Sequence, residues 1–211
     1  MGGNTSSIRL GTGVLIPSNR IEPVTANAFA TLNKLAPGRI DFGVGTGFTG
    51  RRTMGLKPIT LAKMKRYIER VQSLLLGETI EWDLEAQPKK IRFLNPDLGL
   101  INIDDPVDLH ISAMGPKARR LVAEMKAGWL NFGSDPISLV RELQDMHAAW
   151  QGNGVDELMQ HSTVFALGAV LSGTDAENRE KLMAQAAPWT AVMFHNMLDG
   201  VMPVPLNLPE N

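Results

Sequence analysis

Two glycine-rich segments carry the residue types best suited to hold a cofactor. In the longer one, 38–56, a buried-strand pattern at Ile40–Val44 runs into a glycine loop that includes Arg51 and Arg52. The shorter one, Ile8–Ile16, also reaches a glycine near its end. Glycine at the carboxyl end of a buried strand lets a flat or phosphorylated ligand approach the backbone closely. Two such ends in one parallel sheet predict a cofactor site built from strand ends.

The longer loop contains a literal G-x-G-x-x-G at Gly45–Gly50. A dinucleotide site would also need a helix that begins inside the motif and an acidic residue at a strand end about 20 residues on. Here Gly55 and Pro58 oppose a helix, and Glu69 falls inside a helical pattern. We therefore do not expect a Rossmann site. A βα loop without a ligand is the alternative interpretation of either glycine segment.

Charged and small residues near these loops allow two interpretations. Arg51 and Arg52 could bind a phosphate or carboxylate through paired hydrogen bonds, or at least one of them is a solvated loop arginine. The turn Ser112–Pro116 closes one expected strand and opens a helix, which suits an anion. It also suits an ordinary βα turn with proline at the first helical position.

A cluster of acidic residues with one histidine resembles a metal site, but its place in the chain argues against that function. Asp104, Asp105 and Asp108 lie before His110, at the start of a strand, where barrel chemistry is not expected. A solvated turn is the better interpretation. The other histidines show no ligand spacing: His147, His161 and His195. No metal site is predicted.

Strand and helix patterns alternate along the chain. The expected strands are Ile8–Leu15, Arg39–Gly45, Val107–Met114, Trp129–Phe132 and Thr163–Leu171. The expected helices are Val24–Leu35, Leu61–Leu76, Lys117–Ala127, Pro136–Trp150, Asp175–Ala186 and Ala191–Leu198, with Pro188 as a break. Their expected N-caps are Thr60, Ser134 and Thr174. Two short segments, Thr79–Trp82 and Lys90–Phe93, predict a hairpin within an insertion at about 77–106, and the tail from Met202 reads as extended.

This alternation predicts an α/β fold with a parallel sheet and right-handed crossovers. A complete (β/α)₈ barrel has eight strands and about 250 residues, whereas this chain has 211 residues and five main strands. We therefore expect one domain over 1–211, either an open five-stranded sheet or an incomplete barrel.

Composition excludes several classes of partner. The chain has 21 basic and 22 acidic residues, a net charge of −1, which gives no electrostatic basis for binding nucleic acid or an anionic membrane. No apolar run reaches membrane-spanning length, and the first residues lack the pattern of a signal peptide. The absence of cysteine excludes disulfides and fits a cytoplasmic location.

Four blocks in order resemble a known family. They are Ile8–Val14, Ala36–Gly47, Arg52–Leu56 and Leu109–Lys117. Together they resemble bacterial-luciferase-like flavin-dependent oxidoreductases, in particular the methylenetetrahydromethanopterin-reductase-like branch. The resemblance runs from about Ser6 to Phe132 and, more weakly, to about Gly200.

The resemblance implies a (β/α)₈ barrel with an insertion after its fourth strand and with FMN or the deazaflavin coenzyme F420 at the carboxyl ends of the strands. The five expected strands then correspond to the family's third to seventh strands. The first two would precede Met1 and the eighth would follow Asn211, so the chain looks like an internal fragment with impaired turnover.

The resemblance also implies site residues. Gly13 and Val14 match the family's bulge behind the central flavin ring, for which we expect a cis peptide bond. Gly45, Thr46 and Gly47 match a loop beside the cofactor, and we expect Gly47 to leave space for the ring or its tail. Four residues match the cofactor-lining end of the fifth strand: Ser112, Ala113, Met114 and Gly115. Arg51 lies near a position that often contacts the cofactor.

The leading functional hypothesis is therefore an oxidoreductase that transfers a hydride or activates oxygen on a small-molecule substrate. The resemblance implies a flavin reductase or NAD(P)H as electron source and a homodimer for the full-length family. No catalytic acid or base is assigned. The alternative is a non-catalytic truncated barrel or interaction module.

Overall fold

The computed structural model describes residues 2–84, 87–133, 136–166 and 168–198. The chain divides into two compact units, Met1–Val164 and Phe165–Asn211. The predicted cap Ser134 and the tail from Met202 lie outside the described residues.

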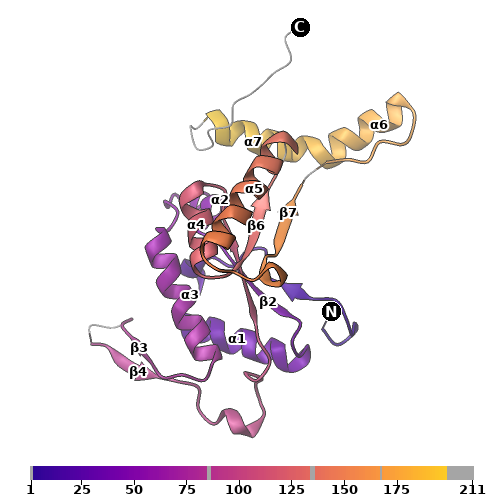
Figure 1. The fold of residues 1–211 in the computed structure, drawn as a ribbon. Helices are drawn as coiled ribbons and strands as arrows, with labels where there is room; N and C mark the ends of the chain where they lie inside the picture. The colour runs from indigo at the N-terminus through magenta and orange to yellow at the C-terminus, as the bar shows by residue number, and fades with distance from the viewer. Residues whose placement is uncertain (1, 85–86, 134–135, 167, 199–211) are drawn as a thin grey trace. The chain divides into compact units, whose positions relative to one another are not determined.

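The first unit is built on a parallel sheet whose strands follow one another in chain order (Figure 1). The order is β1 (Leu10–Gly11), β2 (Ile40–Val44), β5 (Asp108–Ser112), β6 (Gly128–Phe132) and β7 (Ser162–Phe165). The pairs β1–β2, β2–β5 and β5–β6 are parallel. Between β6 and the start of β7, the Trp129 N–H donates to the His161 carbonyl at 2.7 Å. An order without reversal is that of a barrel wall, whereas a doubly wound sheet reverses direction. The prediction of an incomplete barrel is confirmed.

Helices connect the strands and bury one face of the sheet. They are α1 (Glu22–Leu35), α2 (Phe48–Arg52), α3 (Leu61–Leu75), α4 (Pro116–Glu124) and α5 (Pro136–Gly152), with short 3₁₀ turns at Pro17–Asn19, Pro96–Leu98 and Glu157–Met159. The predicted Thr60 cap is confirmed, since its side chain accepts from the Lys63 N–H. The short helix α2 was not predicted, because Gly50 inside it and Gly55 after it favour a loop.

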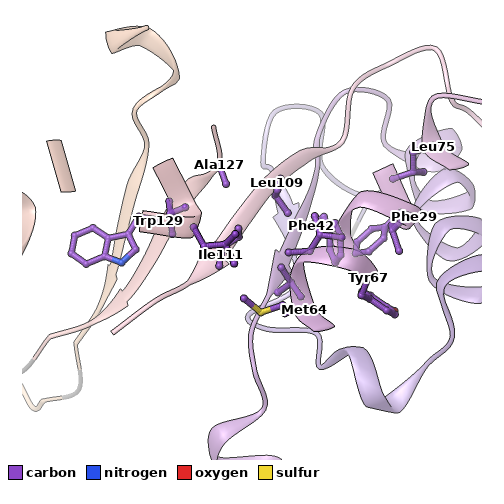
Figure 2. Packing of buried hydrophobic residues seen from close by; sticks show 14 of the residues in the cluster. Phe29, Phe42, Met64, Tyr67, Leu75, Leu109, Ile111, Ala127 and Trp129 are labelled. Carbon is purple, nitrogen blue, oxygen red and sulfur yellow. The ribbon is translucent and has the colours of Figure 1, made fainter. Parts of the chain in front are cut away.

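Side-chain alternation along the strands separates an apolar face from a polar one. In β2, Ile40, Phe42 and Val44 are at most 1% exposed and face the helices. Figure 2 shows Phe42 near Phe29 of α1, and the two ring centroids lie 4.9 Å apart. Leu109 and Ile111 of β5 continue this layer (Figure 2). The intervening residues therefore face the concave side of the sheet, which would be the interior of a barrel.

The predicted hairpin is confirmed. Strands β3 (Ile80–Trp82) and β4 (Lys89–Ile91) pair antiparallel. Glu22 of α1 joins the hairpin to the helices: it accepts from the Trp82 indole at 3.0 Å and lies 3.4 Å from Arg70 of α3. Arg70 also pairs with Asp83 at 2.7 Å, so the hairpin is attached by a network of charges.

Two predictions in the last part of the chain are wrong. β7 ends at Phe165, not at Leu171, because the short apolar run 164–171 gave no signal for its end. Pro188 does not break the helix.

The predicted Thr174 cap is confirmed, since Thr174 forms a capping box at the start of α6 (Asp175–Lys181). A π-helical segment, η4 (Leu182–Ala186), then leads into α7 (Ala187–Leu198), so wider winding accommodates the missing proline N–H.

No helix in the described part of the chain is both long and apolar enough to span a bilayer.

Strand β1 carries a bulge where it meets β2. Gly11 pairs with Asp41 and Leu15 pairs with Val44, so three residues of the first strand (12–14) oppose two of the second (42–43). The extra residue turns the Thr12 carbonyl over Gly43: a Cβ at Gly43 would lie 1.8 Å from that oxygen. The Thr12 hydroxyl donates to the Gly43 carbonyl at 2.6 Å. The peptide bond Gly13–Val14 is cis, as predicted.

Charged and polar side chains occupy the concave face beside this bulge. The Arg9 guanidinium pairs with both Asp41 and Asp108. His110 Nε2 lies 3.7 Å from Asp41 Oδ1, and its ring meets His161 edge-on with centroids 5.3 Å apart. Burial acts to raise the pKa of Asp41, but hydrogen bonds from His110 and Arg9 outweigh it, so the pKa lies below its ordinary value of 3.8.

We predict that Gly43→Ala destabilises the chain by about 3 kcal/mol, the upper part of the overpacking range. The added methyl group meets a main-chain oxygen that cannot rotate away. The free energy of unfolding from urea denaturation measures the effect. Gly152→Ala is the control, since a Cβ at Gly152 meets nothing within 4 Å. Equal stability of the two variants would contradict the described bulge.

We predict that the Asp41 pairing contributes to stability at neutral pH and is lost in acid. A carboxyl whose native pKa is depressed stabilises the fold above its unfolded pKa, and this contribution disappears as the pH falls through the native value. Asp41→Asn should therefore be less stable than the parent at pH 7, and the difference should shrink below about pH 4. Urea denaturation at several pH values tests this, with the exposed Asp97→Asn as control. A difference that does not depend on pH would refute it.

Candidate functional site

The ends of three strands converge at Gly45. A Cβ at this position would lie 2.8 Å from Val14 Cγ2 and 3.4 Å from Ser112 Cβ. The first of these atoms belongs to the bulge after β1, and the second to the last residue of β5. Three of the predicted site residues, Val14, Gly45 and Ser112, are therefore neighbours on the concave side.

The glycine loop after β2 is packed against its own chain. Gly47 has φ +77°, and a Cβ there would lie 2.5 Å from Ile16 Cγ2 and 3.0 Å from the Arg51 side chain. The position that a Gly47 side chain would take is therefore filled by Ile16. That Gly47 leaves space for a cofactor stays a prediction. Gly50 also lacks space for a side chain, since an added Cβ would lie 2.9 Å from Ile16 Cδ1. The loop glycines satisfy internal packing, which the bare motif does not reveal.

Thr46 and Arg51 tie this loop to the residues that follow it. The Thr46 carbonyl accepts from the Ile59 N–H at 3.1 Å. Arg51 donates from its backbone N–H to the Gly47 carbonyl at 2.9 Å and from Nε to the Lys57 carbonyl at 2.6 Å. Arg51 is thus partly engaged in holding the loop, while the Arg52 guanidinium lies 5.9 Å from the centroid of the Phe48 ring.

Open space remains above two other glycines. A Cβ at Gly13 or at Gly115 would meet nothing within 4 Å. Gly13 lies in the bulge, and Gly115 is the N-cap of α4 in an extended conformation. These two positions offer the close backbone approach that the sequence suggested for the glycine loop.

The end of β5 presents a mixed polar and apolar edge. Ala113 is buried, at 1% exposed, whereas the Met114 side chain is 46% exposed. No hydrogen bond joins the Ser112 hydroxyl to any residue that the structure describes. Ser112 and the open position at Gly115 therefore leave a hydroxyl and backbone groups free for a ligand beside the apolar Val14 and Met114.

Several residues that shape this site were not predicted. Thr12, Gly43 and Ile16 build the bulge and the loop, while Trp129 and Arg119 donate to the carbonyls of Ala113 and Met114, at 2.7 and 2.8 Å. Gly43 carried a detectable signal, since a glycine inside a strand often marks a bulge or a close backbone approach. The other four have ordinary types for their positions, and only their contacts reveal a role.

The acidic cluster forms a turn and an ion pair. Asn102 Oδ1 accepts from the N–H groups of Asp104 and Asp105, and Asp108 pairs with Arg9. Within residues 2–84, 87–133, 136–166 and 168–198, no three histidine, aspartate or glutamate side chains are arranged to hold a metal ion. Two cavities along α6, η4 and α7 in the second unit include none of the predicted site residues.

The fold has counterparts among solved structures. The oxygenating constituent of 3,6-diketocamphane monooxygenase from the CAM plasmid of Pseudomonas putida, in complex with FMN, superposes with a TM-score of 0.70 and 13% identity, covering 94% of this chain and 60% of that one. The coenzyme F420-dependent tetrahydromethanopterin reductase of Methanopyrus kandleri gives a TM-score of 0.60 at 19% identity, covering 80% of this chain and 52% of that one. At these identities the likeness concerns the fold.

Curated relatives are similar in sequence. An F420-dependent glucose-6-phosphate dehydrogenase of Nakamurella multipartita is 34% identical over 147 residues, 66% of this chain and 41% of that protein. A 5,10-methylenetetrahydromethanopterin reductase of Archaeoglobus fulgidus is 31% identical over 156 residues, 72% of this chain and 45% of that protein. The chain thus spans less than half the length of these relatives. The family model for luciferase-like monooxygenases matches residues 1–202. The chain belongs to the luciferase-like monooxygenase family.

Proposed function

We propose that the chain forms a cofactor-binding wall of an oxidoreductase that uses coenzyme F420 or FMN. The observation that carries the proposal is the convergence of Val14, Gly45 and Ser112 at one edge of the sheet, with open space above Gly13 and Gly115. Membership of the family supports it. The names of the curated relatives favour F420 as the first candidate, since several are F420-dependent dehydrogenases.

The residues at this edge suit a flat ring system with a polar margin. The bulge at Gly13 and Val14 would contact the ring through backbone and an aliphatic side chain. Ser112 and the open backbone at Gly115 would hydrogen-bond to polar atoms of the cofactor, and Met114 would cover an apolar part. Thr46 and Arg51 would act through the packed loop that supports Gly45 and, for Arg51, through its remaining guanidinium nitrogens. A bound F420 supplies hydride transfer at C5, and a bound FMN supplies hydride transfer or oxygen activation.

A small organic molecule is the proposed substrate. If FMN is the cofactor, reducing equivalents would come from a flavin reductase or NAD(P)H. As in the family at full length, we propose that the active protein is a homodimer, located in the cytoplasm.

A second candidate function is a non-catalytic interaction module. Strand β1 is an edge of the sheet in the described residues, with β2 on one side only. An exposed strand edge favours pairing with another chain. This candidate predicts association without cofactor binding.

We predict that the purified chain binds F420 with a saturable change in cofactor fluorescence, and that FMN competes for the same site. Size measured by light scattering in the same samples separates the two candidate functions. Association without any fluorescence change for either cofactor would refute the oxidoreductase proposal and favour the interaction module.

We predict that Gly115→Val weakens cofactor binding by roughly tenfold or more, equivalent to about 1.4 kcal/mol. The backbone at Gly115 (φ −102°, ψ 161°) accepts a β-branched residue, so the side chain fills the open space without straining the fold. The dissociation constant and the melting temperature are measured together. Gly3→Val is the matched control, since Gly3 is also open. Undiminished affinity in Gly115→Val would show that the site is elsewhere.

A further inference from the structure

Two consecutive peptide carbonyls at the end of β5 are held by buried side chains. Trp129 Nε1 of β6 donates to the Ala113 carbonyl at 2.7 Å. Arg119 Nη1 of α4 donates to the Met114 carbonyl at 2.8 Å. Trp129 is fully buried and Arg119 is 9% exposed. The turn that leads into α4 is therefore fixed by side chains of the helix-covered layer.

Arg119 is itself held in place by acidic partners on α5. Its Nη1 lies 3.5 Å from Glu142 Oε1, and its Nη2 lies 3.7 Å from Asp145 Oδ2. Glu142 in turn accepts from Asn131 Nδ2 of β6 at 2.8 Å. A buried guanidinium is costly unless it is paired, and its planar set of donors can serve a carbonyl and carboxylates at once. The network links β6, α5 and α4 to one carbonyl at the site.

Fixing these carbonyls also fixes the backbone donors next to them. In a planar trans peptide the N–H points opposite to the C=O. The N–H groups of Met114 and Gly115 therefore point away from Trp129 and Arg119. Neither N–H has a hydrogen-bond partner in the part of the chain that the structure describes. Two adjacent donors are thus left free at the open position above Gly115.

We infer that Arg119 is a positioning residue for the cofactor: by holding the Met114 carbonyl, it presents the N–H groups of Met114 and Gly115 to an acceptor atom of the bound group. The inference rests on the proposed function. It assigns Arg119 no contact with the cofactor, and it predicts that affinity depends on the local order of residues 112–116.

Arg119→Met tests the inference, because it keeps an unbranched side chain of similar length in the helix and removes all the donors. The matched control is Arg120→Met, the same change at the next residue, which is exposed. Backbone hydrogen exchange over 108–118, the dissociation constants for F420 and FMN, and the melting temperature are measured for each variant.

The expected result for Arg119→Met is faster exchange confined to the amides of Ser112 and Ala113, because Ala113 donates to the Leu130 carbonyl and loses this bond when the turn loosens. Cofactor binding should be at least about tenfold weaker, while Arg120→Met matches the parent. Arg119→Lys should be intermediate, because it keeps the positive charge but replaces the two nitrogens that make these contacts with a single, compact ammonium group. If Arg119→Met does not fold, the same measurements on Arg119→Lys test the inference.

Three results would overturn the inference. The first is unchanged exchange at Ser112 and Ala113. The second is exchange that rises throughout the chain together with a lower melting temperature, which indicates a purely structural role. Unchanged affinity despite a loosened turn would overturn it as well. Failure of the parent chain to bind either cofactor refutes the proposed function instead, and the exchange pattern still decides whether Arg119 orders the turn.

Discussion

The Thr12 carbonyl lies over the Cα of Gly43, and the geometry of the candidate site depends on this contact. It allows the first strand to carry one residue more than its neighbour and then to resume pairing at Leu15. The extra residue brings Val14 against Gly45, which in turn lies beside Ser112. A side chain at position 43 would separate the two strands at the point where the site begins. The bulge and the glycine that admits it are one structural unit.

The two faces of the sheet differ in polarity. The helix side is a continuous apolar layer that includes Phe42, Met64 and Ile111 (Figure 2). The concave side carries Arg9, Asp41 and His110, and the Arg9 guanidinium pairs there with the Asp41 carboxylate. Arg119 is an exception to this division, since a charged group is buried on the helix side and reaches the site through a carbonyl. Polar groups inside the helix-covered layer are therefore placed where they can order the edge of the sheet.

Much of the fold is predictable from the sequence, because periodicity is strong where burial is one-sided. The helix at Leu61–Leu75 and the strand at Ile40–Val44 follow from their apolar patterns, and Thr60 and Thr174 from capping chemistry. The end of β7 and the winding before Pro188 depend on tertiary surroundings that a local pattern does not encode. At the candidate site, the glycine motif indicates the strand end at Gly45, beside Val14 and Ser112, but not the packing within its own loop. Gly47 packs against the Ile16 side chain. Open space remains instead at Gly13 and Gly115, where an added Cβ would meet no atom within 4 Å.

The π segment at Leu182–Ala186 has a consequence for the direction in which the side chains of α7 point. An i→i+5 segment inside a helix accommodates one residue more than regular α-helical winding would. It ends two residues before Pro188, whose missing N–H already interrupts the backbone hydrogen bonds of the helix, and the Thr190 hydroxyl donates to the Ala186 carbonyl at 3.0 Å. Loss of one residue from this segment would restore regular α-helical winding and leave the residues after it at nearly the same angular positions, because the wider turn takes up the extra residue. The wider turn therefore lets α7 keep the angular relation to α6 that an uninterrupted helix one residue shorter would have.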